Sequence, residues 1–283
     1  MQNKFRKNKY DLGELEKEAA AVCQDFAVFC GYIVENKVKT SKKTGNIGKK
    51  DCFAINALMH ISEKYEKPSY FQGQYPVINL CFYVSVKYKI LEVSPDGTAL
   101  QRGRNFQYFW EASVWEQYVL LLSVVLFDGR FAGRENSWYS VRVADVWEMH
   151  VDGFMEWVAG EKPPAGVKCR LSRGSGIRSF YDLAYVLPYL EGLNLIKIWE
   201  KPDSGTQARE YEWEIEAQPL LEMVSDLYEN TDIAEDEDTT GQDSEDTDHI
   251  VKYYYEAFME KLAPENRSGC LLKMFEKPGI QNH

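Results

Sequence analysis

The sequence of 283 residues predicts a mainly α-helical fold with small β-hairpins, an α+β fold. Apolar residues recur at three- and four-residue steps over long stretches, which is the period of helices buried on one side. The β-prone runs are short, and Pro- and Gly-containing turns join them in pairs. Two helical segments followed by such a pair occur twice, at roughly 37–101 and 141–217. We therefore expect two similar units, with further helices at both ends of the chain.

The chain is expected to begin with a long amphipathic helix. One apolar stripe runs from residue 11 to about residue 36, and Asp11 is the expected N-cap. A polar segment follows with a Thr-Gly-Asn turn at 44–46, and the next helix is expected over 49–63. Pro76 then stands where the first residue of a helix is favoured.

The segment after Pro76 is apolar almost all round, so a buried helix and a short β run both fit it. We favour a helix that ends near Lys87. A hairpin should follow, with strands over 89–93 and 98–101 joined at Pro95-Asp96-Gly97. One long, heavily buried helix is then expected over 110–127.

A similar order of elements is expected downstream. Pro188 lies within one helical pattern there, and it should kink that helix or shift its start. The expected elements are a helix over 141–157, a basic glycine-containing loop over 168–178, a helix over 180–195, strands over 196–201 and 211–217, a helix over 220–228 and an amphipathic helix over 250–262. The apolar stripe of the last helix must pack on the main body.

Composition excludes several classes of protein. With 45% hydrophobic residues the chain is not disordered, and it has no apolar run of membrane-spanning length and no signal peptide, so we expect a soluble cytoplasmic protein. Its six cysteines include no Cys-x-x-Cys pair and its four histidines are scattered, so we expect buried free thiols and neither a metal site nor a cofactor. The seven tryptophans fall at helical or strand spacing and are expected to build the core.

Residues 229–248 hold ten acidic residues and no Lys or Arg. Without those ten charges the net charge of −11 becomes −1, so the low isoelectric point does not exclude nucleic acid as a partner. We interpret the segment as a solvated linker or loop, or alternatively as a strip that competes with phosphates for a basic surface. The expected organisation is 1–130 with the N-terminal helix and first unit, 131–228 with the second unit, the acidic linker at 229–248, and C-terminal helices over 249–283.

Two stretches without acidic residues carry the candidate binding residues. One spans 37–50 and the other spans 168–178, and either could face a polyanion. A solvated lysine-rich turn is the simpler interpretation of the first, and a plain turn at 173–176 is the simpler alternative to an anion site of free N–H groups in the second. The candidates for contacting nucleic acid are Lys42, Lys43, Lys49, Lys50, Lys168, Arg170, Arg173 and Arg178.

The order of helix, turn, helix and hairpin is that of a winged helix. The stretches KKTGNIGKKDCFAINAL (42–58) and YPVINLCFYVSVKYKILEV (75–93) resemble a winged-helix-like module of uncharacterised bacterial proteins, and are distantly similar to winged helices beside bacterial helicases. The resemblance covers about a third of the chain and consists mostly of hydrophobic spacing. It implies a winged-helix fold and no particular activity, so no catalytic residue is carried over.

Neither candidate recognition helix has the side chains of a base reader. The first, 76–87, offers Asn79, Ser85 and Lys87, and the second, 180–195, offers mainly acidic groups that phosphates repel. Enzyme signatures such as a P-loop or a G-x-S-x-G elbow are absent. We therefore expect a non-enzymatic protein that contacts nucleic acid through basic loops with little sequence readout. The alternatives are a protein-interaction or scaffold module that uses apolar helix faces and, well behind these, an unrecognised enzyme.

Overall fold

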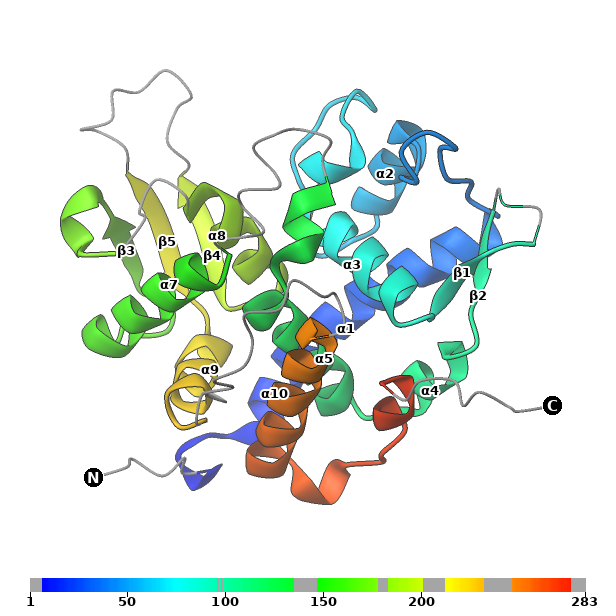
Figure 1. The fold of residues 1–283 in the computed structure, drawn as a ribbon. Helices are drawn as coiled ribbons and strands as arrows, with labels where there is room; N and C mark the ends of the chain where they lie inside the picture. Colours follow the sequence, from blue (N-terminus) through cyan, green and yellow to red (C-terminus); the bar gives the residue numbers. More distant parts are fainter. Residues whose placement is uncertain are drawn as a thin grey trace.

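The computed structural model describes residues 7–95, 97, 99–134, 147–177, 183–200, 212–231 and 246–275. Within these residues the chain is mainly α-helical with two small antiparallel sheets, as the sequence predicts. Helix α5 (Val114–Phe127) runs through the centre, between a first unit on the right and a second on the left (Figure 1). Every residue from Trp115 to Leu126 is buried, so this helix is the middle of the core.

The first unit begins with α1 (Leu12–Glu35), whose predicted N-cap is confirmed. The Asp11 carboxylate accepts hydrogen bonds from the backbone N–H groups of Gly13 and Glu14, at 3.1 and 3.2 Å. Helix α3 (Pro76–Lys87) also has the predicted bounds, with Pro76 in its first turn. The β alternative for this segment is therefore wrong.

Helix α2 (Lys49–Asn56) is shorter than the helix expected over 49–63, which is wrong at its C-terminal end. The buried carboxylate of Asp25 on α1 accepts the backbone N–H groups of His60 (2.8 Å) and Ile61 (3.1 Å). A continuing helix needs these two donors for its own carbonyl groups. The competing acceptor lies 35 residues upstream of His60, so the helical pattern alone does not reveal it.

A hairpin of β1 (Leu91–Val93) and β2 (Leu100–Arg102) follows α3 near the expected positions. The single helix expected over 110–127 is wrong, because the chain forms α4 (Phe106–Glu111) and then α5. Ser113 separates the two helices as the N-cap of α5. Its side chain accepts the Glu116 N–H, and the Glu116 carboxylate accepts the Ser113 N–H, which together form a capping box.

The second unit contains α7 (Trp147–Glu161), β3 (Lys168–Leu171), α8 (Leu183–Gly192), β4 (Ile196–Glu200) and β5 (Trp213–Ala217). Residues 168–171 form a strand, so the loop expected over 168–178 is wrong in its first part. The three strands form an antiparallel sheet in the order β3-β5-β4. In the strand register, Lys168 lies opposite Glu216, and Arg170 lies opposite Glu214.

The two units share one order of connection. In the first, Lys39 precedes α2 and α3 and forms an antiparallel bridge with Ala99, next to β2. In the second, β3 precedes α8 and pairs with β5. In both units the extended residues before the helices therefore join the second strand of the hairpin.

The units meet where α3 packs against α8. Asn79 on α3 is buried and donates from Nδ2 to the Phe131 carbonyl group (3.0 Å) and to the Tyr189 hydroxyl on α8 (3.2 Å). Asn79 also accepts a hydrogen bond from Gln72 at 3.0 Å. Asn79, one of the three polar residues of this candidate recognition helix, thus joins α3 to α8.

The C-terminal part returns to the body after α9 (Pro219–Glu229). Helix α10 (Asp246–Leu262), the expected amphipathic helix, packs along α5 (Figure 1). Residues 232–245 of the acidic segment lie outside the described residues, whereas both of its ends are helical. The short 3-10 turns are Lys7–Lys9, Gln72–Gln74, Gly129–Arg134, Arg173–Ser175, Pro264–Asn266 and Leu271–Met274.

The start of α10 is held by a group of charged residues at the end of α5. The fully buried Asp128 carboxylate lies 2.6 Å from Lys87 Nζ and 2.8 Å from Arg130 Nε, and it accepts the Tyr83 hydroxyl at 2.7 Å. Asp248 on α10 pairs with the same two cations, at 2.6 Å from Lys87 and 3.2 Å from Arg130. One end of the acidic segment is thereby fixed beside the ends of α3 and α5.

Candidate nucleic-acid interface

The first basic stretch lies on an ordered surface turn and on the start of α2. Lys42 and Lys43 are exposed in the turn, which closes through a Gly45 N–H to Ser41 carbonyl hydrogen bond of 2.7 Å. The Ser41 hydroxyl also accepts the N–H groups of Lys43 and Thr44, both at 3.3 Å. This turn presents its two adjacent lysines outward on a fixed backbone.

Lys49 and Lys50 are the first two residues of α2. Lys49 Nζ donates to the Ser69 carbonyl group at 2.7 Å and lies 3.7 Å from the centroid of the Phe71 ring. The Phe71 side chain is 64% exposed. A cation and an exposed aromatic ring thus stand together beside Lys50, which is itself exposed.

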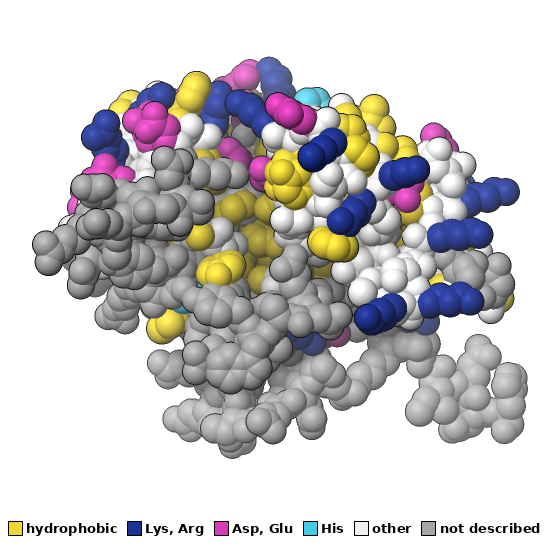
Figure 2. Space-filling model, turned by 90° about the horizontal axis from the view of Figure 1, so that it is seen from above, with side chains coloured by type: hydrophobic (Ala, Val, Ile, Leu, Met, Phe, Trp, Pro, Cys, Tyr) yellow, Lys and Arg dark blue, Asp and Glu magenta, His cyan; other side chains and the backbone are white. Residues whose placement is uncertain are grey.

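The surface of residues 37–70, which we call the lysine face, carries eight lysines and three acidic residues. The structure describes this whole stretch, and none of its lysines has an ion-pair partner among the described residues. Figure 2 shows that Lys and Arg side chains prevail on the right of the upper surface, where the first unit lies. The positive charge of this face is therefore not neutralised within the described part of the protein.

The second basic stretch has acidic partners across the sheet. Lys168 Nζ lies 2.7 Å from a Glu214 carboxylate oxygen, and Arg170 lies within 4.0 Å of Glu212 and Glu214. Opposite charges on neighbouring strands stabilise a sheet, and that pairing explains these two cations without a ligand. The Arg173 side chain and Arg178 lie outside the described residues. Of the second predicted cluster, the described side chains Lys168 and Arg170 thus lie beside acidic residues, unlike the lysines of the first.

In the turn at 173–176, backbone N–H groups that could bind an anion donate hydrogen bonds within the turn itself. The Gly174 N–H donates to Ser172 Oγ at 3.2 Å, and the Ser175 N–H donates to the Ser172 carbonyl group at 2.9 Å. Residues 178–182, between this turn and the described start of α8 at Leu183, lie outside the described residues. These contacts favour the plain-turn interpretation over an anion site.

The helices at the recognition position are covered. On α3, Asn79 is 5% exposed and Ser85 is fully buried, so neither can reach a base edge. On α8 the outward side chain is Tyr185, whereas Glu191 turns to accept the Ile198 N–H at 2.7 Å. The expectation that these helices do not read bases agrees with their burial.

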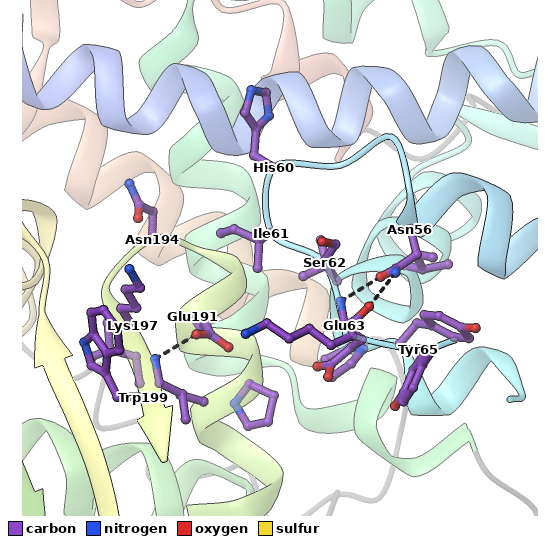
Figure 3. A pocket seen from close by; sticks show the side chains of 18 of the residues that line it. Asn56, His60, Ile61, Ser62, Glu63, Tyr65, Glu191, Asn194, Lys197 and Trp199 are labelled. Carbon is purple, nitrogen blue, oxygen red and sulfur yellow. Dashed lines mark hydrogen bonds between the residues drawn. The ribbon is translucent and has the colours of Figure 1, made fainter. Parts of the chain in front are cut away.

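A cleft of about 520 Å³ lies between the two units (Figure 3). Its first wall is the segment after α2, with His60, Lys64 and Tyr65, and its second wall is α8 and β4, with Lys197 and Trp199. Its lining combines apolar side chains, which include Ile61, Val77, Ile78, Ile196 and Ile198, with about as many polar and charged ones. The volume is that of a typical ligand site.

Hydrogen bonds to the body fix the first wall of the cleft. Besides the two N–H donors described above, the His60 ring nitrogen Nδ1 lies 2.9 Å from Asp25. Asn56 at the end of α2 bonds both backbone groups of Glu63, at 2.8 and 2.9 Å (Figure 3). Burial raises the pKa of Tyr65 to about 12, and its protonated hydroxyl donates to the Gln74 carbonyl group. This wall is therefore preorganised.

The second wall carries an aromatic residue that the sequence reasoning assigned to the core. Trp199 is 44% exposed, whereas Trp115, Trp147 and Trp213 are buried as expected. The indole N–H donates to Glu216 at 2.9 Å, and hydrogen bonds from Gln218 and Trp199 lower the pKa of that carboxyl group. Alternation along Ile196-Lys-Ile-Trp does signal this exposure, because it places Trp199 on the same face as Lys197.

The described residues contain no cluster of three or more His, Cys, Asp and Glu side chains able to hold a metal ion. The cysteines are free, and four of the six are buried. Burial raises the pKa of the Cys23 thiol to about 12, so this thiol is protonated at neutral pH and is a poor nucleophile. No helix in the described ranges combines the length and the apolar character that crossing a membrane requires.

Comparison with known proteins gives no relative to reason from: no family model, no curated protein and no solved structure matches the chain.

Proposed function

We propose that this protein is a non-enzymatic module of two winged-helix-like units that contacts nucleic acid through the lysine face, with little sequence readout. The repeated order of connection supports the two units: in each, an extended segment is followed by helix (α2 and α3 in the first, α8 in the second) and then by a hairpin whose second strand pairs with that segment or extends to it. Because α3 and α8 are buried against each other, the contact with nucleic acid falls to loops and helix ends.

The observation that carries the proposal is the unneutralised charge of the lysine face. When lysines without acidic partners bind a phosphate backbone, they release its counterions, which favours binding. This contribution to the affinity does not depend on base sequence. The paired Lys168 and Arg170 would have to leave Glu214 first, so we assign the contact to the first unit. Burial of most of α3 and α8 favours this proposal over the scaffold alternative, which depends on exposed apolar helix faces.

The test measures binding of labelled DNA and RNA at several salt concentrations, with wild type and with Lys42→Ala/Lys43→Ala. We expect wild-type affinity to fall steeply with salt and to vary little between sequences of one length. The double variant should bind more weakly. Its slope of log K against log salt should be smaller by about one for each phosphate that the missing ammonium groups no longer neutralise.

The matched control is Lys17→Ala/Lys162→Ala, which removes the same charge from exposed positions outside the lysine face. It should leave the salt slope within error of wild type, because its effect is restricted to long-range attraction, which salt screens. Undetectable binding by wild type at low salt would overturn the proposal. Equal losses in the two double variants would overturn its assignment to the lysine face.

A further inference from the structure

We infer that the cleft between the units binds single-stranded nucleic acid, with backbone phosphates along its lysine-bearing rims and a base stacked on Trp199. This inference rests on the proposed function and specifies the form of nucleic acid. It starts from the cleft itself, whose volume of about 520 Å³ fits nucleotides and not a duplex. A protein that reads a duplex inserts a protruding helix or ribbon into the major groove, which is about 12 Å wide. Both candidate helices of this protein are buried.

Charge on both rims favours a polyanion. Lys64 on the first wall and Lys197 on the second are exposed, and neither has an ion-pair partner within the described ranges. The first rim belongs to the lysine face, of which Lys67 and Lys49 are also part. The cleft also contains Glu63 and Glu191, so phosphates belong at the rims and bases belong inside.

The exposed indole gives the site its second component. Lys168 Nζ and Lys197 Nζ lie 3.9 and 4.0 Å from the centroid of the Trp199 ring, and the indole N–H is held by Glu216. A base that stacks on the ring face beside Lys197 displaces that ammonium group, which can then pair with a phosphate, whereas Lys168 remains paired with Glu214. Aromatic rings beside cations in a groove are the arrangement by which proteins bind single strands without reading sequence.

The experiment uses the full chain and fluorescence anisotropy at low salt. The probes are labelled oligo-dT and oligo-rU of about 12 nucleotides, a length within the range that one such groove covers, and a hairpin duplex of equal charge. We expect wild type to bind the single strands about tenfold or more tighter than the duplex. The DNA and RNA probes decide which of the two single strands is preferred.

Trp199→Ala should weaken single-strand binding about fivefold or more, the loss that accompanies removal of one base–aromatic stack. Trp199→Phe retains a ring and should stay within about twofold of wild type. The control is Tyr253→Ala, which removes an aromatic side chain of similar exposure (40%) from α10 outside the cleft, and it should leave binding unchanged. Thermal unfolding of each variant confirms that the fold is retained.

The outcomes distinguish a failure of this inference from a failure of the proposed function. Binding of single strand and duplex with equal affinity, unchanged in Trp199→Ala but weakened in Lys42→Ala/Lys43→Ala, would overturn the cleft and leave the proposed function standing. Absence of binding to every probe would overturn both. Single-strand preference that is lost in Trp199→Ala and restored in Trp199→Phe would support both.

Discussion

At the scale of single residues, Asp128 shows how one buried charge joins distant parts of the chain. Burial by itself would raise the pKa of this carboxyl group, but the hydrogen bonds and positive charges of Arg130 and Lys87 outweigh that effect and lower it. Asp248 completes the group from α10. Removing one partner of a buried ion pair is costly, because Lys87 and Arg130 remain largely or partly buried and then keep Asp248 as their only acidic partner in this group.

Asp128→Asn should therefore destabilise the protein by about 3–5 kcal/mol at neutral pH. Because the folded-state pKa lies below the unfolded value of about 3.9, the carboxylate contributes its stabilisation above that pH and loses it as the pH falls further, through the lowered folded pKa. When urea unfolding is measured between about pH 7 and pH 2, the free energy of unfolding should fall less for Asp128→Asn than for wild type as the pH decreases. Glu14→Gln, which breaks the exposed pair with Lys17, should change stability by less than about 0.5 kcal/mol.

At the scale of the elements, local signals account for the helices that could be predicted closely. Asp11 and Pro76 fix the starts of α1 and α3, because a cap and a proline act on their own backbone neighbourhood. The break before α5 was also readable, since Ser113 and Glu116 have the spacing of a capping box. The early end of α2 was not, because Asp25 acts from another helix.

The same distinction holds for the candidate site. The lysines of 37–50 were proposed from sequence because their lack of acidic neighbours is local, and within the described residues the structure adds no ion-pair partner for them. Lys168 and Arg170 gave the same signal, but Glu214 and Glu216 reach them only through strand pairing. The cleft requires two segments more than a hundred residues apart, so no local pattern contains it.

The β1–β2 hairpin depends on a close approach at Gly103. A Cβ atom at this position would lie 2.2 Å from the Lys89 carbonyl oxygen, and the Gly103 N–H donates to Ile90 at 2.8 Å. Gly103→Ala should destabilise the protein by about 1–3 kcal/mol, because the backbone must shift to make room. Gly160→Ala on α7, where no atom lies within 4 Å, should instead stabilise by up to about 1 kcal/mol. Equal effects in thermal unfolding would contradict this assignment.

At the scale of the whole molecule, the two units and α10 share one core around α5. Contacts from α1, α7 and α10 cover this helix, and α3 meets α8 beside it. The C-terminal segment also binds the start of α5, where the Glu116 carboxylate accepts the Ser268 N–H at 3.0 Å and the Ser268 hydroxyl at 2.9 Å. We therefore expect the protein to unfold as one cooperative unit.

Phe258→Ala tests that expectation, because Phe258 on α10 is fully buried and its ring contacts Phe127 at the end of α5. The variant should lose about 3–5 kcal/mol while keeping a single unfolding transition in denaturant. Glu260→Ala, an exposed position on the same helix, should stay within about 0.5 kcal/mol of wild type. Two separate transitions would show that α10 is an independent appendage.

The late position of α10 in the chain has a consequence for protein synthesis. The apolar helix α5 is complete at residue 127, but α10, which covers one side of it, begins only at residue 246. At roughly 5–20 residues per second, a ribosome takes about 6–24 s to make the intervening stretch. During that time the side of α5 that α10 later covers has no partner from α10, so we expect chaperones to bind the nascent chain until α10 has been made.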